Sequence, residues 1–199
     1  MKKDREKTKV DCPPIALLRS YKVYPREIKF DYFKVQYFLY VYLDPFKSLQ
    51  KPLEAAGFCF GFEPFYVGKG AGTGYRQNHH VQSFANRKKN PREVQGWNSY
   101  KLKKFEEIEK KMEQAAARHD TDLPWDWNDY KDQWIIIAFS SDDPNATIDR
   151  EMSLIKGLGV VDGGSGTRSE VKRGPLINRI TNSFKQDGIV RRKNRIYIL

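Results

Sequence analysis

The sequence predicts a mixed α/β (α+β) fold, with a small mixed or antiparallel sheet of about three strands, flanked by helices and decorated by insertions. Three runs, 35–43, 64–68 and 133–139, are rich in the β-branched and aromatic residues that favour strands. Residues 98–118 and 144–158 carry apolar positions at helical spacing. With 199 residues and 39% hydrophobic content, the chain can bury one sizeable core.

The first strand, 35–43, is apolar and aromatic on both faces, which is typical of a central strand. We expect Asp44-Pro45 to end it, because proline interrupts the hydrogen bonding of a sheet. Residues 46–63 then form a connection to the second strand, 64–68, which is expected to run antiparallel to the first.

The glycine-rich run 68–74 follows the second strand. It matches neither the Walker A pattern GxxxxGK[ST] nor the dinucleotide-binding pattern GxGxxG. We therefore interpret its glycines as a flexible turn. The turn leads into a helix over 75–85 that carries Arg76 and His80 one turn apart on one face.

The second half of the chain alternates helix and strand. Residues 98–118 form the clearest helix, 119–132 read as an acidic, Trp-rich loop, and 133–139 read as a buried strand. Asp143 and Pro144 have the residue types of an N-cap and a first helical position. They begin a helix that ends at Gly159.

These elements suggest three parts. Residues 1–33 are interpreted as an N-terminal extension, 34–182 as the main domain with an insertion at 86–132, and 183–199 as a basic C-terminal tail.

The formal net charge of +11 favours a polyanionic partner such as nucleic acid, although a soluble protein can also be basic without one. Cys12 and Cys59 form no CxxC pair, so a zinc site is not expected. No apolar leader or membrane-spanning run is visible. We therefore expect an intracellular location, cytoplasmic or nucleoid-associated, with two free thiols.

Glu151 has an unusual position in the helix 144–158. The apolar residues Ile148, Met152, Ile155 and Leu158 fall on one arc of this helix, and Glu151 lies within that arc. A carboxylate on a core-facing arc is costly unless it is paired or binds a metal. The alternative is a glutamate at the rim of the core whose head reaches water.

Three aromatic residues of the first strand, Phe38, Tyr40 and Tyr42, share one face because side chains alternate along a strand. Tyr66 on the second strand lies beside them if the register allows. Tyrosines in strands are more often core residues than functional ones, so this pattern carries weight only together with the others.

Together these residues resemble the GIY-YIG nuclease family, over roughly residues 36–85 and 133–182. The two tyrosine motifs are followed at family spacing by a lysine, an arginine and a histidine, then by a glutamate on a later helix and an asparagine after a turn. In chain order these are Tyr40-Val41-Tyr42, Tyr66-Val67-Gly68, Lys69, Arg76, His80, Glu151 and Asn178.

The resemblance implies an endonuclease that hydrolyses DNA phosphodiester bonds with one divalent metal ion. Glu151 is then the protein ligand of Mg2+ or Mn2+. Tyr42 is expected to deprotonate the attacking water, helped by the charge of Lys69. Because Tyr40 stands where the family has glycine, both Tyr40 and Tyr42 are candidates for this tyrosine role.

Arg76 is expected to bind the phosphate and stabilise the charge of the transition state. Tyr66 and His80 are expected to orient water or phosphate oxygens, with the adjacent His79 as an alternative imidazole. For Asn178, fixing the local backbone is a more natural role than chemistry.

DNA contacts are expected from basic side chains, which bind phosphates without reading sequence. One metal site cuts one strand, so a homodimer or two successive nicks would cut both. The alternative function is a catalytically silent nucleic-acid-binding protein on the same fold. The candidate DNA-binding residues are Arg87, Lys88, Lys89, Arg92, the lysines of 101–104, Lys172, Arg173, Arg191, Arg192 and Lys193.

Overall fold

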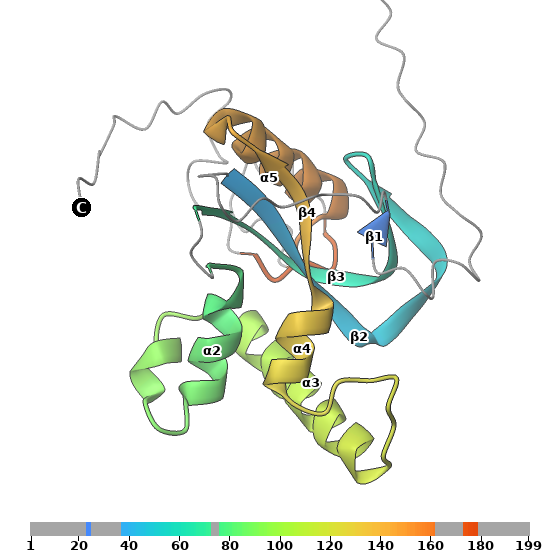
Figure 1. Ribbon diagram of the computed structural model, residues 1–199, viewed down its shortest axis with the longest axis vertical. Coiled ribbons are helices and arrows are strands. Elements are labelled where there is room, and N and C mark those ends of the chain that lie inside the picture. The colour runs from blue at the N-terminus through green and yellow to red at the C-terminus, as the bar shows by residue number, and fades with distance from the viewer. Residues whose placement is uncertain (1–22, 25–36, 73–75, 162–172, 179–199) are drawn as a thin grey trace, which may run out of the picture.

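The structure is a computed structural model that describes residues 23–24, 37–72, 76–161 and 173–178 (Figure 1). Its strands form one antiparallel sheet in the order β1-β3-β2-β4. Three long strands with flanking helices confirm the predicted fold class. The strands are β1 (Val23–Tyr24), β2 (Tyr37–Ala55), β3 (Phe58–Ala71) and β4 (Ile135–Ser141).

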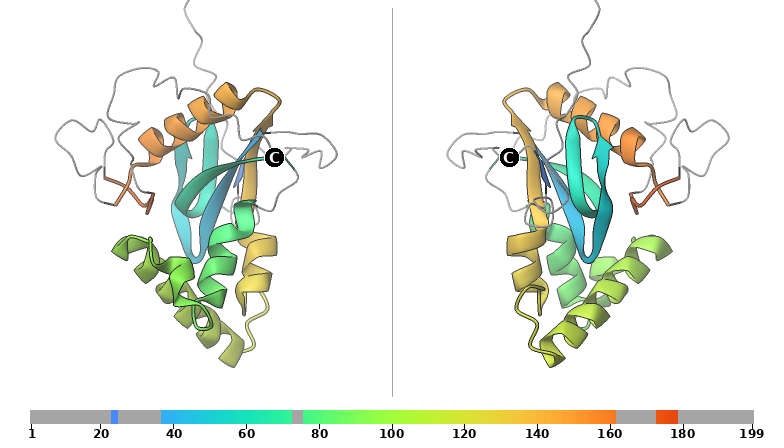
Figure 2. Two further views of the ribbon diagram at one scale, coloured as in Figure 1. Left: turned by 90° about the vertical axis from the view of Figure 1, so that its left-hand side faces the viewer. Right: turned by 90° about the vertical axis from the view of Figure 1, so that its right-hand side faces the viewer.

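The helices gather at opposite ends of this sheet. One end carries α5 (Pro144–Leu158), and the other carries α2, α3 and α4 (Figures 1 and 2). The described α-helices at that second end are α2 (His79–Asn86), α3 (Ser99–Ala117) and α4 (Trp127–Trp134). None of the helices in the described ranges has the length and hydropathy that crossing a membrane requires.

Strands β2 and β3 form one long hairpin, so the predicted connection over 46–63 is wrong. Its two-residue turn is Ala56-Gly57, and both residues have positive φ, 50° and 83°. Strand β2 runs on through Pro45 instead of ending there. The register shifts between Leu43 and Ser48, and such an irregularity accommodates a proline because no ladder hydrogen bond is needed there.

The pairing register explains the glycines of β3. Tyr40 lies opposite Gly68, and Phe38 lies opposite Gly70. A Cβ atom on Gly68 would lie 2.5 Å from Cζ of Tyr40, and one on Gly70 would lie 2.2 Å from Cζ of Phe38. These two glycines are therefore part of the strand and make room for aromatic rings, so interpreting them as a flexible turn is wrong.

The segment 86–132, predicted to be an insertion, supplies part of the main core. Helix α3 confirms the predicted helix and buries Phe105 and Ile108. The predicted loop over 119–132 is wrong in its second half, where α4 begins after Asp126, which caps the backbone N–H groups of two following residues. The residues of α4 that join the core are Trp127, Tyr130 and Trp134.

Two other expectations concern the chain ends and the cysteines. The predicted boundaries near residues 33 and 182 lie outside the described residues, although Val23–Tyr24 of the predicted extension pairs with β3. Cys59 is fully buried and disulfide-bonded, so the expectation of two free thiols is wrong.

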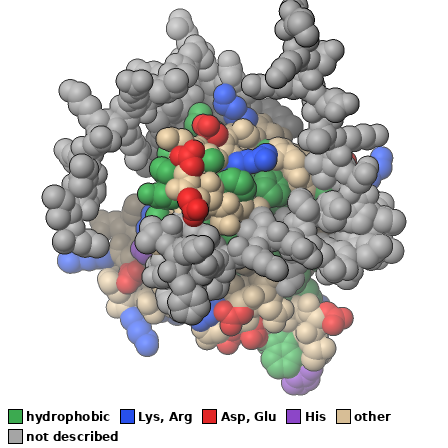
Figure 3. Space-filling model, turned by 45° about the horizontal axis from the view of Figure 1, so that its top comes forward, with side chains coloured by type: hydrophobic (Ala, Val, Ile, Leu, Met, Phe, Trp, Pro, Cys, Tyr) green, Lys and Arg blue, Asp and Glu red, His purple; other side chains and the backbone are tan. Residues whose placement is uncertain are grey.

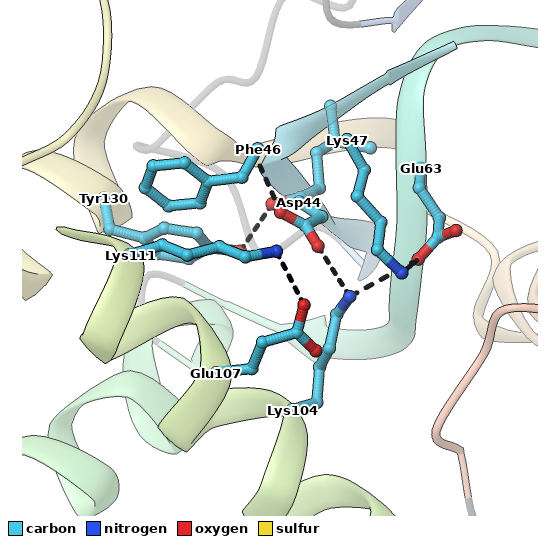
Figure 4. Close-up of polar contacts among 9 residues, drawn as sticks. Asp44, Phe46, Lys47, Glu63, Lys104, Glu107, Lys111 and Tyr130 are labelled. Carbon is cyan, nitrogen blue, oxygen red and sulfur yellow. Dashed lines mark hydrogen bonds and ion pairs between the residues drawn. The ribbon is translucent and has the colours of Figure 1, made fainter. Parts of the chain in front are cut away.

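A buried ionic network ties the irregular part of β2 to α3 (Figure 4). Asp44 is fully buried, accepts a hydrogen bond from the backbone N–H of Phe46 at 2.9 Å, and pairs with Lys104 Nζ at 2.6 Å. Lys104 also lies 3.3 Å from Glu63, which pairs with Lys47 at 3.0 Å. Lys104 therefore serves the fold and is not the DNA-binding residue that the sequence suggested.

We predict that Gly68→Ala destabilises the protein by about 1–3 kcal/mol, because the new methyl group must displace the buried ring of Tyr40. Gly96→Ala is the matched control, since a Cβ atom there meets nothing within 4 Å. Urea unfolding measures both changes. Equal stability of the two variants would contradict the close packing of Tyr40 on Gly68.

We also predict that Lys104→Met lowers the free energy of unfolding by about 3 kcal/mol, because it leaves the buried Asp44 carboxylate without its cation. Lys103→Met, on the exposed side of the same helix, should change it by less than about 0.5 kcal/mol. Thermal unfolding at neutral pH compares the two. A Lys104→Met protein as stable as the control would show that the ionic network contributes nothing.

Candidate active site

Three tyrosines from the β2–β3 hairpin lie together on one face of the sheet, as the alternation of the strand predicts. Tyr42 is paired directly with Tyr66 in the sheet register. The ring centroids of Tyr42 and Tyr66 are 5.3 Å apart, those of Tyr40 and Tyr42 are 5.7 Å apart, and those of Tyr40 and Tyr66 are 6.3 Å apart. The three phenols therefore form one cluster.

The hydroxyl groups of these tyrosines differ in their surroundings. Tyr42 is fully buried and donates a hydrogen bond to the backbone carbonyl of Gln77. Tyr66 is only partly buried, and its hydroxyl lies 2.9 Å from Nε2 of His80 and is hydrogen-bonded to Tyr40. Of the three, Tyr66 is the tyrosine that is not fully buried.

Glu151 lies on the buried face of α5, next to the tyrosines. The buried neighbours on that face are Thr147, Leu154, Ile155 and Leu158. Ile148 and Met152, which the predicted arc includes, are only partly buried, so the buried face is rotated slightly from the predicted one. The side chain of Glu151 is 15% exposed, and its Oε2 pairs with Lys69 Nζ at 2.9 Å. The glutamate thus reaches solvent from within the core-facing side of the helix.

The charges of Glu151 on α5 and of Arg76 before α2 act on the phenols of this cluster. Burial, followed by the charge of Glu151, raises the pKa of Tyr66 to about 12, and the charge of Arg76 opposes this rise. Burial is also the main cause that raises the pKa of Tyr40. The charge of Glu151 raises this pKa as well, and the charge of Arg76 lowers it. Arg76 and Glu151 therefore both lie close enough to act on the tyrosines.

Burial raises the pKa of Tyr42 well above its usual value, and the nearby phenols of Tyr40 and Tyr66 add to this shift. Among the charged groups acting on Tyr42, Arg76 lowers its pKa. The cation that eases ionisation of the cluster is thus Arg76 and not Lys69, which pairs with Glu151 instead.

His80 is held between Tyr66 and a residue that the sequence did not single out for this site. Lys101 Nζ on α3 lies 2.8 Å from Nδ1 of His80 and 4.1 Å from the ring centroid of Trp97. Burial, followed by the charges of Lys101, His79 and Arg76, lowers the pKa of His80 to about 3. The imidazole is therefore uncharged at neutral pH.

Asn178 holds the second tyrosine motif in place. Its side-chain amide donates to the Val67 carbonyl at 2.6 Å and accepts from the Val67 N–H at 2.9 Å. The backbone N–H of Ile177 donates to the carbonyl of Phe65 at 2.8 Å. Residues around Asn178 thus bind the backbone on both sides of Tyr66, which is the structural role expected for this asparagine.

The basic residues proposed to bind DNA divide into buried and exposed groups. Lys101 and Lys104 are buried, so predicting phosphate contacts for them is wrong. Arg87 is bound to Glu109 and stacked 3.6 Å from the ring centroid of Phe84. The exposed candidates are Lys88, Lys89, Arg92, Lys103 and Arg173, whereas Lys172, Arg191, Arg192 and Lys193 lie outside the described residues.

The end of the molecule that carries α5 does not present a uniform basic surface. Acidic, basic and apolar side chains alternate there in the part of the chain that Figure 3 colours by type. Exposed residues of α5 include both Asp149 and Arg150. The outer side of α5 is therefore a poor candidate for the DNA-binding surface.

Within the described ranges, no group of three or more His, Cys, Asp or Glu side chains is arranged to hold a metal ion. Glu151 is the carboxylate that the structure places beside the tyrosines. Comparisons of the chain with protein-family models, with curated proteins and with solved structures find no match.

Proposed function

We propose that this protein is an endonuclease that hydrolyses DNA phosphodiester bonds with one divalent metal ion, by a mechanism of the GIY-YIG type. The main support is that the carboxylate of Glu151 on α5 and the guanidinium of Arg76 both act on the phenol of Tyr66 on β3, which is only partly buried. Residue 151 is far from residues 66 and 76 in sequence, and ordinary core packing does not require this combination.

Glu151 is the residue that would hold Mg2+ or Mn2+. Its carboxylate is a hard oxygen ligand, it is partly open to solvent, and its counter-ion Lys69 is itself 44% exposed and can move aside. A divalent cation held by Glu151 would supply Lewis-acid chemistry, polarising the scissile phosphate and stabilising the leaving oxygen.

Tyr66 is better placed than Tyr42 to act as the general base. The hydroxyl of Tyr42 is occupied by the carbonyl of Gln77 and is buried, so water cannot reach it. Tyr66 is only partly buried, and its hydroxyl lies within hydrogen-bonding distance of His80, which can orient it. The proposal therefore moves the role of base from Tyr42 to Tyr66 and gives Tyr42 a structural role.

Arg76 is exposed beside this cluster and would bind the scissile phosphate, because a guanidinium forms paired hydrogen bonds with phosphate oxygens. The exposed residues Lys88, Lys89 and Lys103 would contribute phosphate contacts away from the cut. The net charge of +11 supports such a footprint, and binding dominated by phosphates weakens steeply as salt increases.

The first test is nicking of supercoiled plasmid. We predict that wild-type protein nicks in Mg2+ and not in EDTA, and that Glu151→Gln lowers the rate at least about a thousandfold. Asp149→Asn is the matched control, since it removes an exposed carboxylate from the same helix, and should keep the wild-type rate. Thermal unfolding of each variant separates loss of activity from loss of fold.

Cleavage by Glu151→Gln at the wild-type rate, or cleavage in EDTA, would refute the metal-dependent mechanism. DNA binding by the wild type with no cleavage in Mg2+ or Mn2+ would instead favour a nucleic-acid-binding protein without catalytic activity.

The second test separates the two tyrosines. Tyr66→Phe should lower the cleavage rate by about two to four orders of magnitude, because it removes the general base. Tyr42→Phe should lower stability by about 1–2 kcal/mol, because the Gln77 carbonyl loses its donor, while the folded protein remains active. The reverse pattern in single-turnover cleavage, with Tyr42→Phe inactive and Tyr66→Phe active, would overturn the assignment.

A further inference from the structure

A line of three side chains runs from the candidate active site into the protein interior. Tyr66 on β3 contacts Nε2 of His80 on α2 at 2.9 Å, and Nδ1 of His80 contacts Nζ of Lys101 on α3 at 2.8 Å. Lys101 is buried, with 8% of its surface exposed. A lysine buried at the inner end of such a line has no access to a DNA backbone, so another role must explain it.

The charge state of Lys101 determines which nitrogen of His80 carries hydrogen. An ammonium group can only donate, so charged Lys101 requires a bare Nδ1 and leaves Nε2–H to donate to the Tyr66 oxygen. A neutral amine can accept, so neutral Lys101 takes a hydrogen bond from Nδ1–H, and Nε2 then accepts from the Tyr66 hydroxyl. The two states of Lys101 thus correspond to two tautomers of His80.

The surroundings of Lys101 favour the neutral form of its amine. Burial, followed by the charge of Arg76 in the 3-10 helix Arg76–Asn78 before α2, lowers its pKa to about 7. The other groups facing this line are Tyr66, whose ring centroid is 5.0 Å from Lys101 Nζ, and His79 and Tyr42 beside His80. Lys104, one turn away on α3, pairs with Asp44 instead.

We propose that Lys101 is the terminal proton acceptor of a relay through which Tyr66 loses its proton when it acts as general base. This inference rests on the proposed nuclease function. In the step, the Tyr66 O–H bond breaks as His80 Nε2–H forms, and the His80 Nδ1–H bond breaks as Lys101 Nζ–H forms. Phenol and amine become phenolate and ammonium without any redox change, and the phenolate takes a proton from the attacking water.

The relay explains why three elements meet at one imidazole. His80 remains neutral before and after the transfer, which fits the strong lowering of its pKa. Arg76 stabilises the phenolate, because its charge lowers the pKa of Tyr66. Lys101 is buried and contacts Nδ1 of His80, so it is a positioning and proton-accepting residue that acts through His80.

The first experiment tests the relay without DNA. Nitrogen-15 NMR of the ring nitrogens in the full chain is simple, because the chain has only three histidines. We expect His80 to carry hydrogen on Nδ1 at about pH 9 and on Nε2 at about pH 6, as Lys101 becomes charged. In Lys101→Met this change of tautomer should vanish. A His80 tautomer that stays the same over this range in wild type would overturn the proposal.

The second experiment uses cleavage. Lys101→Arg keeps a buried cation that can stack on Trp97 but cannot accept a proton, so it should be about a hundredfold slower than wild type at about pH 9. Lys110→Arg, exposed on the same helix, is the control and should keep the wild-type rate. A packing role for Lys101 predicts the opposite, with Lys101→Arg active and only Lys101→Met impaired, and that result would overturn the relay.

The two experiments distinguish failure of the relay from failure of the nuclease proposal. If the wild type cleaves DNA but His80 keeps one tautomer, the relay is wrong and the nuclease proposal remains. If His80 changes tautomer but the wild type cleaves no DNA under any metal condition, the nuclease proposal is wrong and the relay loses its catalytic purpose.

Discussion

The register of the β2–β3 hairpin is the constraint on which the site depends. The two-residue turn at Ala56-Gly57 joins the strands, and the irregular pairing between Tyr42 and Leu53 must then return to a register that places Tyr42 opposite Tyr66. A shift of one residue would move Tyr66 to the other face of the sheet, away from His80 and Glu151. Gly68 enforces this register, because only a residue without a side chain accommodates the Tyr40 ring.

Helix α3 packs against this sheet and carries two buried lysines, whose amino groups have different surroundings. Lys104 faces Asp44 and Glu63, so it is paired with carboxylates and serves the fold. Lys101, three residues earlier on the helix, faces an imidazole and two aromatic rings and has a pKa lowered to about 7. Neighbouring positions on one helix thus combine a permanent ion pair with an amine that can change its charge near neutral pH.

Local patterns in the sequence predicted much of this arrangement. The alternation of Phe38, Tyr40 and Tyr42 placed them on one face, and the cap at Asp143 and the stop at Gly159 predicted the bounds of α5 correctly. The position of Glu151 predicts a partner, because an acid within an apolar helical face is energetically unfavourable without one, and the structure pairs it with Lys69. These predictions succeeded because each depends on residues close together in the chain.

Features set by contacts between distant segments were missed. Pro45 suggested a strand end, but pairing with β3 continues past it once the register shifts. Trp127, Tyr130 and Trp134 have helical spacing after the capping Asp126, a signal that an acidic, Trp-rich composition concealed. In the sequence, Lys101 resembles the surface lysines of a charged helix. Its burial depends on contacts with His80 and Trp97, which the sequence pattern of the helix does not indicate.

The most direct measurement of the central claim is a crystal structure of the wild-type protein with Mn2+ and a DNA duplex that carries a non-cleavable phosphate analogue. The account predicts an anomalous scattering peak for Mn2+ at the carboxylate of Glu151, with the substituted phosphate against the guanidinium of Arg76 and a water molecule beside the hydroxyl of Tyr66. Mn2+ and DNA bound on a different surface, with the tyrosine cluster facing away from the duplex, would contradict it.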